Sequence, residues 1–295
     1  MSHHLLFLYL KAFSITGGIE KVNRVLLKAL YEMQLQQLWT VTAASPYATT
    51  ANEKYFPDKQ LIGFGGSRWR FMLAMVFRAL RPDMLFVAHI NLAPAARLIK
   101  WKYPDMKIVA IAHGIEVWRE MSGIKKWLLQ HADRIITVSQ FTKTKLIDVQ
   151  GIDAGKIAVL PNCLDPYFKP PVQLGKPEYL LQRHALQPGQ KVLLTITRLS
   201  AWEAYKGYDN ILRCIPDLLR HWPDLTYIIG GKYDPTEKKR LDGIIAELGI
   251  EKNVQIIGFV SDEELTDYYC LADVFVMPSK KEGFGLVFIE AMACG

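Results

Sequence analysis

Two cations in the later half of the chain have the chemistry and the position to bind a diphosphate. Arg198 and Lys206 follow an aliphatic run, 192–197, that predicts a buried strand. Arg offers a planar fork of donors and Lys a compact point charge, so together they suit a pair of phosphate groups. They would also stabilise the charge that develops on a diphosphate as it leaves. The alternative is that both are solvated loop cations.

Two carboxylates, Glu282 and Glu290, lie in the last segment, 278–295. Eight helical steps would leave them roughly 80° apart around the axis and about 12 Å apart along it. This spacing excludes a close acid/base pair unless the first carboxylate lies in a loop. It fits the two ends of a bent sugar nucleotide, with Glu282 facing sugar hydroxyls and Glu290 accepting from ribose hydroxyls. Phosphate oxygens are favoured at a helix N-terminus, where we place the backbone of Gly283, Phe284 and Gly285.

The earlier half carries two weaker signals. Gly17 and Gly18, in the motif that begins at Thr16, follow the first predicted strand and open a helix, where backbone amides could approach phosphate; a plain tight turn explains them equally well. His113 follows the predicted strand 107–112, and His89 follows another. Open α/β sheets place their sites at this end of the strands, so the His113 imidazole could contact a sugar hydroxyl or the reacting centre, and His89 could line the acceptor side. Packed structural histidines are the alternative.

Composition excludes several classes of protein. The chain has 295 residues, half of them hydrophobic, and a net charge of +7, so it can bury a large core. No run approaches the 18 or so apolar residues of a bilayer span, and we expect a cytoplasmic protein, either soluble or attached to the inner face of a membrane. The four cysteines show no Cys-x-x-Cys spacing, which indicates neither a metal site nor a disulfide framework.

Positive charge is concentrated in the first half. Residues 1–170 hold 22 Lys or Arg against 12 Asp or Glu, whereas the remainder holds 14 against 17. This excess suits an anionic partner such as a phospholipid surface. Within it, segment 67–81 mixes cations with bulky apolar residues at helical spacing, as interfacial helices do. A core helix with basic ends explains the same pattern, and the sequence leaves the two interpretations open.

Short aliphatic runs alternate with helical patterns along the whole chain, which predicts an α/β fold with parallel sheets. Proline and glycine turns fill 164–190, and we place a domain boundary there, giving domains 1–172 and 173–295. Both are expected to be doubly wound, Rossmann-like units. Four strands with an open edge would be an aggregation liability, so we expect the second domain to be incomplete at its C-terminal end.

The predicted strands and helices are the following. In the first domain we expect strands at 4–10, 38–42, 84–88, 107–112, 134–138 and 157–160, and an opening helix at 21–31. In the second we expect strands at 192–197, 226–229, 254–257 and 274–277, and helices at 207–220, 235–248, 262–271 and from about 285.

Taken in order, these motifs resemble glycosyltransferase family 4, a group of retaining GT-B glycosyltransferases. The resemblance covers essentially the whole chain, and it is carried by 17–20, 112–114, 132–139, 159–162, Arg198 with 206–207, and 282–290. It implies that Arg198 and Lys206 bind the donor diphosphate, that Glu282 contacts the transferred sugar, and that Glu290 holds the ribose. The backbone near Val260 would meet the base, Gly17 and Gly18 would approach the donor phosphates, and His113 would lie beside the anomeric carbon.

The resemblance implies transfer of a hexose, of the mannose or glucose type, from a UDP- or GDP-sugar to a glycan or lipid-linked acceptor, in polysaccharide or glycolipid assembly. Retention in such enzymes is commonly described as a front-face displacement that needs no protein nucleophile. No Asp-x-Asp occurs in the chain, so we expect neither a metal nor another cofactor. Two alternatives stay open, a sugar-nucleotide epimerase and a non-catalytic sugar-nucleotide-binding subunit. Nucleic-acid binding is not expected, because no recognition motif is present.

Overall fold

The computed structural model describes residues 3–13, 17–78, 80–172 and 174–295. The chain forms two compact units, Met1–Pro166 and Tyr167–Gly295. The break between them falls inside the segment rich in proline and glycine, six residues before the boundary expected at 172/173. Among the residues that the structure describes, we find no helix whose length and apolar content would let it traverse a bilayer.

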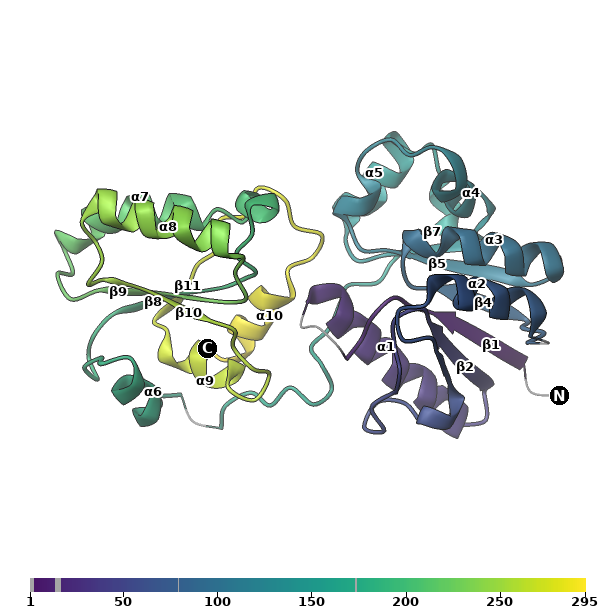
Figure 1. Ribbon diagram of the computed structural model, residues 1–295, viewed down its shortest axis with the longest axis horizontal. Coiled ribbons are helices and arrows are strands. Elements are labelled where there is room, and N and C mark those ends of the chain that lie inside the picture. The colour runs from purple at the N-terminus through teal and green to yellow at the C-terminus, as the bar shows by residue number, and fades with distance from the viewer. Residues whose placement is uncertain (1–2, 14–16, 79, 173) are drawn as a thin grey trace. The chain divides into compact units, whose positions relative to one another are not determined.

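The first unit is built on a parallel sheet of seven strands in the order β3-β2-β1-β4-β5-β6-β7 (Figure 1). The strands are β1 (His3–Leu8), β2 (Trp39–Ser45), β3 (Leu61–Gly63), β4 (Met84–Val87), β5 (Lys107–Ala112), β6 (Arg134–Thr137) and β7 (Ile157–Val159). β2 and β3 extend the sheet on one side of β1 and β4 to β7 extend it on the other side, so β1 and β4 lie side by side. This is the doubly wound arrangement that the alternating pattern predicted.

Helices cover both faces of this sheet. In β1 the side chains alternate, with Leu6 and Leu8 in one apolar core and Leu5 and Phe7 in the other. The first core is closed by α2 (Arg68–Phe77), α3 (Ala93–Lys102), α4 (Gly123–His131) and α5 (Gln140–Asp148), and the second by α1 (Gly18–Leu35). Short 3₁₀ turns lie at Asp58–Gln60, Ile90–Leu92, Ile115–Val117 and Ala154–Lys156.

The second unit has a smaller parallel sheet in the order β10-β9-β8-β11. Its elements are α6 (Glu178–Arg183), β8 (Val192–Ile196), the 3₁₀ turn η5 (Ala201–Lys206), α7 (Tyr208–Leu219), β9 (Thr226–Gly230), α8 (Pro235–Leu248), β10 (Val254–Gly258), α9 (Leu265–Leu271), β11 (Val274–Phe275) and α10 (Leu286–Ala293). One face of the sheet packs against α7 and α8, and the other against α6 and α9 (Figure 1). Each predicted strand is present, and the observed strand ends differ from the predicted ones by at most three residues.

Two predictions about elements were wrong. The segment 164–190 was interpreted as linker only, but it contains α6, whose Leu180 and Leu181 are buried against α9. The turn residues around this helix masked a single amphipathic turn. The short strand β3 was also missed, because three residues show no usable periodicity.

Candidate functional site

The predicted donor-binding residues of the second unit lie at the edge of the sheet where its strands end. In a parallel sheet all carboxyl ends meet at one edge, which is where α/β folds place ligands. Arg198 follows β8, Lys232 follows β9 and Phe259 follows β10. Loop 276–285 follows β11 and leads into α10. The strand topology therefore gathers these loops at one rim.

Two of the loops are held together by backbone contacts. The amide of Lys280 donates to the carbonyl oxygen of Tyr205 at 2.8 Å. Gly207 has a φ of +82°, and a Cβ atom there would lie 2.5 Å from the carbonyl oxygen of Pro278. Glycine is therefore required twice over at this position, by its left-handed backbone and by the close approach. The consequence is that the loop after β8 lies directly against the loop after β11.

This contact brings Lys206 and Glu282 together. The Lys206 Nζ lies 2.6 Å from a Glu282 carboxylate oxygen, and both side chains are largely shielded from solvent, at 15% and 28% exposure. The predicted cation and the predicted sugar-facing carboxylate thus form one ion pair at the rim.

Arg198 lies in the same loop as Lys206. Its Nε lies 3.6 Å from a carboxylate oxygen of Glu203, in the turn that ends at Lys206. Burial, Glu203 and Glu282 raise the pKa of the Tyr205 phenol, while Arg198 lowers it. The Lys206 Nζ also lies 5.6 Å from the centre of the Tyr205 ring. We call Arg198, Lys206 and Glu282 the charged cluster.

The start of α10 lies beside the charged cluster. Its N-cap residue, Gly285, has a φ of +84°, and a Cβ atom there would meet the Phe288 ring at 2.6 Å and the Glu282 Cγ at 3.1 Å. The Glu282 side chain therefore lies over the helix N-terminus, as expected for a carboxylate in the preceding loop. Gly283 and Phe284 belong to that loop, between the carboxylate and the cap.

Glu290 is placed differently from the other predicted donor residues. Its side chain is buried, at 4% exposure, and its carboxylate accepts a hydrogen bond of 3.0 Å from the Tyr269 hydroxyl of α9. Burial and the Glu290 charge raise the pKa of Tyr269, so this hydroxyl stays a donor. The Glu290 carboxylate thus lies at the contact between α10, which carries it, and α9. Its role toward a ribose stays a prediction.

The loop after β9 carries a residue that the sequence analysis missed. Lys232 follows Gly230 and Gly231, and its Nζ lies 5.1 Å from the centre of the Phe259 ring, a cation–π distance. Phe259 is half exposed, whereas the side chain of its neighbour Val260 is buried. The rule that selected Arg198, a cation directly after a buried strand, would have found Lys232 as well.

In the first unit, His113 and His89 lie side by side at the carboxyl ends of β5 and β4. Their ring centroids are 6.2 Å apart, and a ring nitrogen of His113 lies 2.7 Å from the carbonyl oxygen of Ala88. Because a carbonyl only accepts, this Nε2 carries the proton. The other nitrogen, Nδ1, is buried and has no hydrogen-bond partner among the described residues. The Nδ1 of His113 is therefore a buried hydrogen-bond acceptor without a partner among the described residues.

Both imidazoles are neutral near pH 7. Burial is the largest cause that lowers the pKa of His89, to about 4, and burial also lowers the pKa of His113. Glu116 and Glu20 act in the opposite direction on His113, and Glu116 also accepts from the His113 amide at 2.6 Å. Neutral rings at the rim can exchange hydrogen bonds with hydroxyl groups without adding charge.

The two predicted glycines lie at the start of α1. Gly17 is the N-cap of α1, and its carbonyl oxygen accepts from the Lys21 amide at 3.0 Å. Glu20, in the first turn of α1, is one of the charges that raise the pKa of His113. Gly17 has a φ of −148°, so no left-handed conformation requires glycine there. Gly18 begins the helix, and Thr16 lies outside the described residues.

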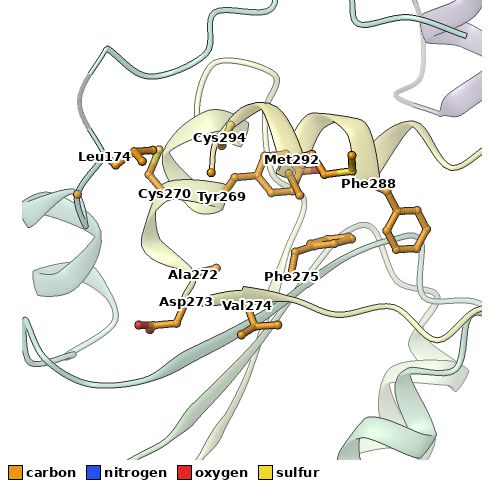
Figure 2. Close-up of a pocket in the computed structure, with 13 residues that line it drawn as sticks. Leu174, Tyr269, Cys270, Ala272, Asp273, Val274, Phe275, Phe288, Met292 and Cys294 are labelled. Atoms are coloured by element: carbon orange, nitrogen blue, oxygen red, sulfur yellow. The ribbon is translucent and has the colours of Figure 1, made fainter.

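A separate cavity of about 580 Å³ opens beside β11, the edge strand of the second sheet. Figure 2 shows that its walls are mainly apolar side chains from β11, α9 and α10. The charged residue of its lining, Asp273, is paired with Lys176 at 2.5 Å and Lys191 at 3.1 Å. None of the residues predicted to act in the site lines this cavity. We therefore do not place the donor site there.

Comparisons with known proteins agree with this architecture. The family model described as Glycosyltransferase Family 4 matches residues 16–168, and the model described as Glycosyl transferases group 1 matches residues 178–295.

Among relatives, a GDP-mannose-dependent α-(1-6)-phosphatidylinositol monomannoside mannosyltransferase of Mycolicibacterium smegmatis is 30% identical over 202 residues, which are 64% of this chain and 50% of the relative. A mannosylfructose-phosphate synthase of Agrobacterium fabrum is 30% identical over 174 residues, 57% of this chain and 37% of the relative. The chain thus spans half or less of the length of these relatives.

Solved structures share the fold. The protein HepE of Anabaena, crystallised in complex with UDP, is 20% identical and superposes with a TM-score of 0.75 over 100% of this chain and 79% of HepE. A glycosyltransferase from Rickettsia africae, also 20% identical, gives a TM-score of 0.75 over 99% of this chain and 77% of its own. At this level of identity the likeness establishes the fold, two Rossmann-like domains of the GT-B kind.

Proposed function

Because the chain belongs to glycosyltransferase family 4, we propose that it transfers a hexose from a nucleotide-diphosphate sugar to a glycan or lipid-linked acceptor, with retention of anomeric configuration. The observation that carries the proposal is the charged cluster. Two cations of the loop after β8 and one carboxylate of the loop after β11 lie at the rim of the second sheet, with Lys206 and Glu282 in direct contact.

In the proposed reaction the charged cluster acts on the leaving group. The bond between the anomeric carbon and the diphosphate oxygen breaks, and a bond from the same carbon to the acceptor oxygen forms on the same face. The acceptor's proton passes to a phosphate oxygen of the departing diphosphate. Arg198 and Lys206 stabilise the negative charge that builds on that group, so the positive charge comes from the protein and no metal is invoked. Glu282 accepts hydrogen bonds from sugar hydroxyls.

His113 is proposed to lie beside the sugar. Its buried Nδ1 is an acceptor because Nε2 donates to Ala88, so it can receive a hydrogen bond from a sugar hydroxyl. A buried acceptor that lacks a partner is costly. A hydrogen bond donated by a sugar hydroxyl would relieve that cost, which favours a role for His113 in orienting the sugar.

The donor is proposed to be a UDP- or GDP-sugar. One relative is named for GDP-mannose and one structural neighbour was crystallised with UDP, so both bases belong in the test. The relative from Mycolicibacterium acts on a phosphatidylinositol mannoside by name, which supports a glycolipid or polysaccharide acceptor. We further propose that the protein works in the cytoplasm at the inner face of the membrane.

Two measurements test the function. A thermal-shift panel of nucleoside diphosphates identifies the base, since a ligand that binds the folded state raises the apparent stability. UDP-glucose and GDP-mannose labelled in the sugar are then incubated with the chain and with phospholipid and monosaccharide acceptors. We expect label in a glycoside product. Label in an isomerised donor would support an epimerase instead, and nucleotide binding without turnover would support a non-catalytic subunit; either result contradicts the proposal.

A further inference from the structure

Helix α2 has two apolar faces, and the core uses only one of them. Phe71 and Met75 are buried under the sheet, whereas Trp69, Leu73 and Phe77 are exposed by 67%, 47% and 77%. At about 100° per residue the three exposed side chains fall within an arc of about 80°, and the centre of this arc is about 180° from that of the buried pair. The apolar spacing that left segment 67–81 open to two interpretations therefore serves both a core face and a solvent face.

The neighbouring helix α3 extends this exposed surface. The Lys102 Nζ, at the end of α3, donates to the carbonyl oxygens of Val76 and Arg78 at 2.5 and 3.0 Å, which ties the C-terminal ends of α2 and α3 together. Trp101, one residue before Lys102, is 76% exposed. Two tryptophans, a leucine and a phenylalanine thus face solvent from two joined helices.

A third helix, α4, lies beside α3. The Arg97 guanidinium is 5.7 Å from the centre of the Trp127 ring, and α2, α3 and α4 close the same apolar core on one face of the sheet (Figure 1). None of these three helices contains an Asp or a Glu. Their basic residues are Arg68, Arg70, Arg97, Lys100, Lys102, Lys125 and Lys126.

We propose that this surface, the outer face of α2, α3 and α4, binds an anionic phospholipid membrane. Exposed aromatic and aliphatic side chains among cations are the chemistry that enters the headgroup region, because apolar atoms reach the acyl boundary while cations pair with lipid phosphates. Tryptophan suits this boundary through its amphipathic ring.

Charge and apolarity together decide between occupants. A second copy of the chain would place this surface against itself and bring like charges together, which costs free energy. A nucleic acid would use the cations but leave Leu73 and Phe77 without partners. An anionic bilayer satisfies both kinds of side chain. The surface belongs to the first unit alone, so the inference does not rest on the charged cluster or on the proposed transfer reaction.

Vesicle flotation tests the surface with the chain as it is. We expect binding to phosphatidylcholine vesicles that contain phosphatidylglycerol, weak binding to phosphatidylcholine alone, and a loss of binding as salt is raised. The Arg68→Glu/Arg70→Glu variant should partition at least about tenfold less, because each basic residue near an anionic surface contributes about a factor of five.

An apolar variant tests the other half of the proposal. Trp69→Ser/Phe77→Ser should also partition at least about tenfold less, because each substitution removes apolar area that the bilayer would bury. Both side chains are mostly exposed, so thermal unfolding of this variant should match that of the wild type. Leu35→Ser, on α1 and 62% exposed, is the matched apolar control. Lys239→Glu/Lys252→Glu, exposed in the second unit, is the matched charge control. Both controls should float like the wild type.

Three results would overturn the inference. One is wild-type binding that ignores phosphatidylglycerol. Another is flotation of both test variants at the wild-type level. The third is a concentration-dependent dimer, seen by sedimentation without vesicle binding and abolished by Trp69→Ser/Phe77→Ser, which would assign the surface to self-association. Nucleotide binding measured on the same samples keeps this outcome separate from the proposed function.

Discussion

Replacing Lys206 with methionine should weaken the binding of a nucleoside diphosphate while leaving the fold intact. Methionine keeps most of the apolar stem, so the packing of this largely shielded side chain is conserved. What disappears is the ammonium that lies 2.6 Å from Glu282. If this group also binds the donor diphosphate, its loss removes a charge-assisted hydrogen bond of about 1.5–3 kcal/mol. The dissociation constant of UDP or GDP, whichever the chain prefers, should then rise about ten- to a hundredfold.

Glu282→Gln is the matched control. It breaks the same ion pair from the other side and keeps the volume of the side chain. Because a negative charge near the diphosphate is removed, nucleotide affinity should stay the same or increase, whereas sugar transfer should fall. Both variants should lose about 1–3 kcal/mol of unfolding free energy in urea, because each removes one partner of a largely shielded ion pair.

Isothermal titration with UDP, GDP and the matching nucleosides provides the measurement. Uridine and guanosine lack the diphosphate, so their affinities should not change in Lys206→Met. Unchanged diphosphate affinity in a folded Lys206→Met variant would refute the assignment of this cation. An equal loss in Lys206→Met and Glu282→Gln would show instead that the ion pair acts by holding the two loops together.

Three further predictions follow from single contacts. Arg198→Ala and Glu290→Gln should each lower kcat/KM for sugar transfer at least about tenfold. Glutamine is chosen at position 290 because the buried carboxylate accepts a hydrogen bond, which the amide oxygen can still accept. Unchanged turnover in both variants would remove these residues from the mechanism. Gly207→Ala should destabilise the chain by about 2 kcal/mol or more in urea unfolding, because of the left-handed backbone and the clash with the loop after β11. Gly249→Ala is the control: Gly249 has a φ of +65° but open space where a Cβ atom would lie, so its replacement should cost about 1 kcal/mol. Equal losses in the two variants would contradict the close approach at Gly207. Because the pKa of His89 is lowered in the folded chain, the unfolded chain binds a proton that the folded chain does not, and the free energy of unfolding should fall as the pH drops from 6.5 to about 4. His89→Gln should reduce this pH dependence by about 1 kcal/mol per pH unit. An unchanged pH dependence in denaturant titrations would contradict the prediction.

Local patterning was enough to predict most of the fold. Parallel strands buried on both faces read as short aliphatic runs, and β5 and α8 have the bounds that the sequence predicted. The same logic located Arg198 and His113, because a polar residue directly after such a run must lie at the carboxyl edge of the sheet. The family resemblance then supplied roles that the residues alone left open.

Contacts between distant segments were decided only by the tertiary structure. Lys206 and Glu282 are 76 residues apart, and they meet because Gly207 lets the loop after β8 touch the loop after β11. Nothing local to either residue specifies that approach. The same holds for the burial of Glu290 against Tyr269 and for the tautomer of His113, which is set by the carbonyl of Ala88, directly after the neighbouring strand β4.

The sequence by itself determined the alternation of strands and helices, the positions of the sheet edges and the excess of positive charge in the first half. It did not decide which face of α2 meets the core, because apolar residues occupy both sides of that helix and periodicity cannot tell a buried stripe from an exposed one. The packing of α2 against the sheet settled this by burying Phe71 and Met75 and leaving Trp69 and Phe77 in solvent. Whether a side chain is buried depends on the residues that pack against it, and the whole fold decides which residues those are.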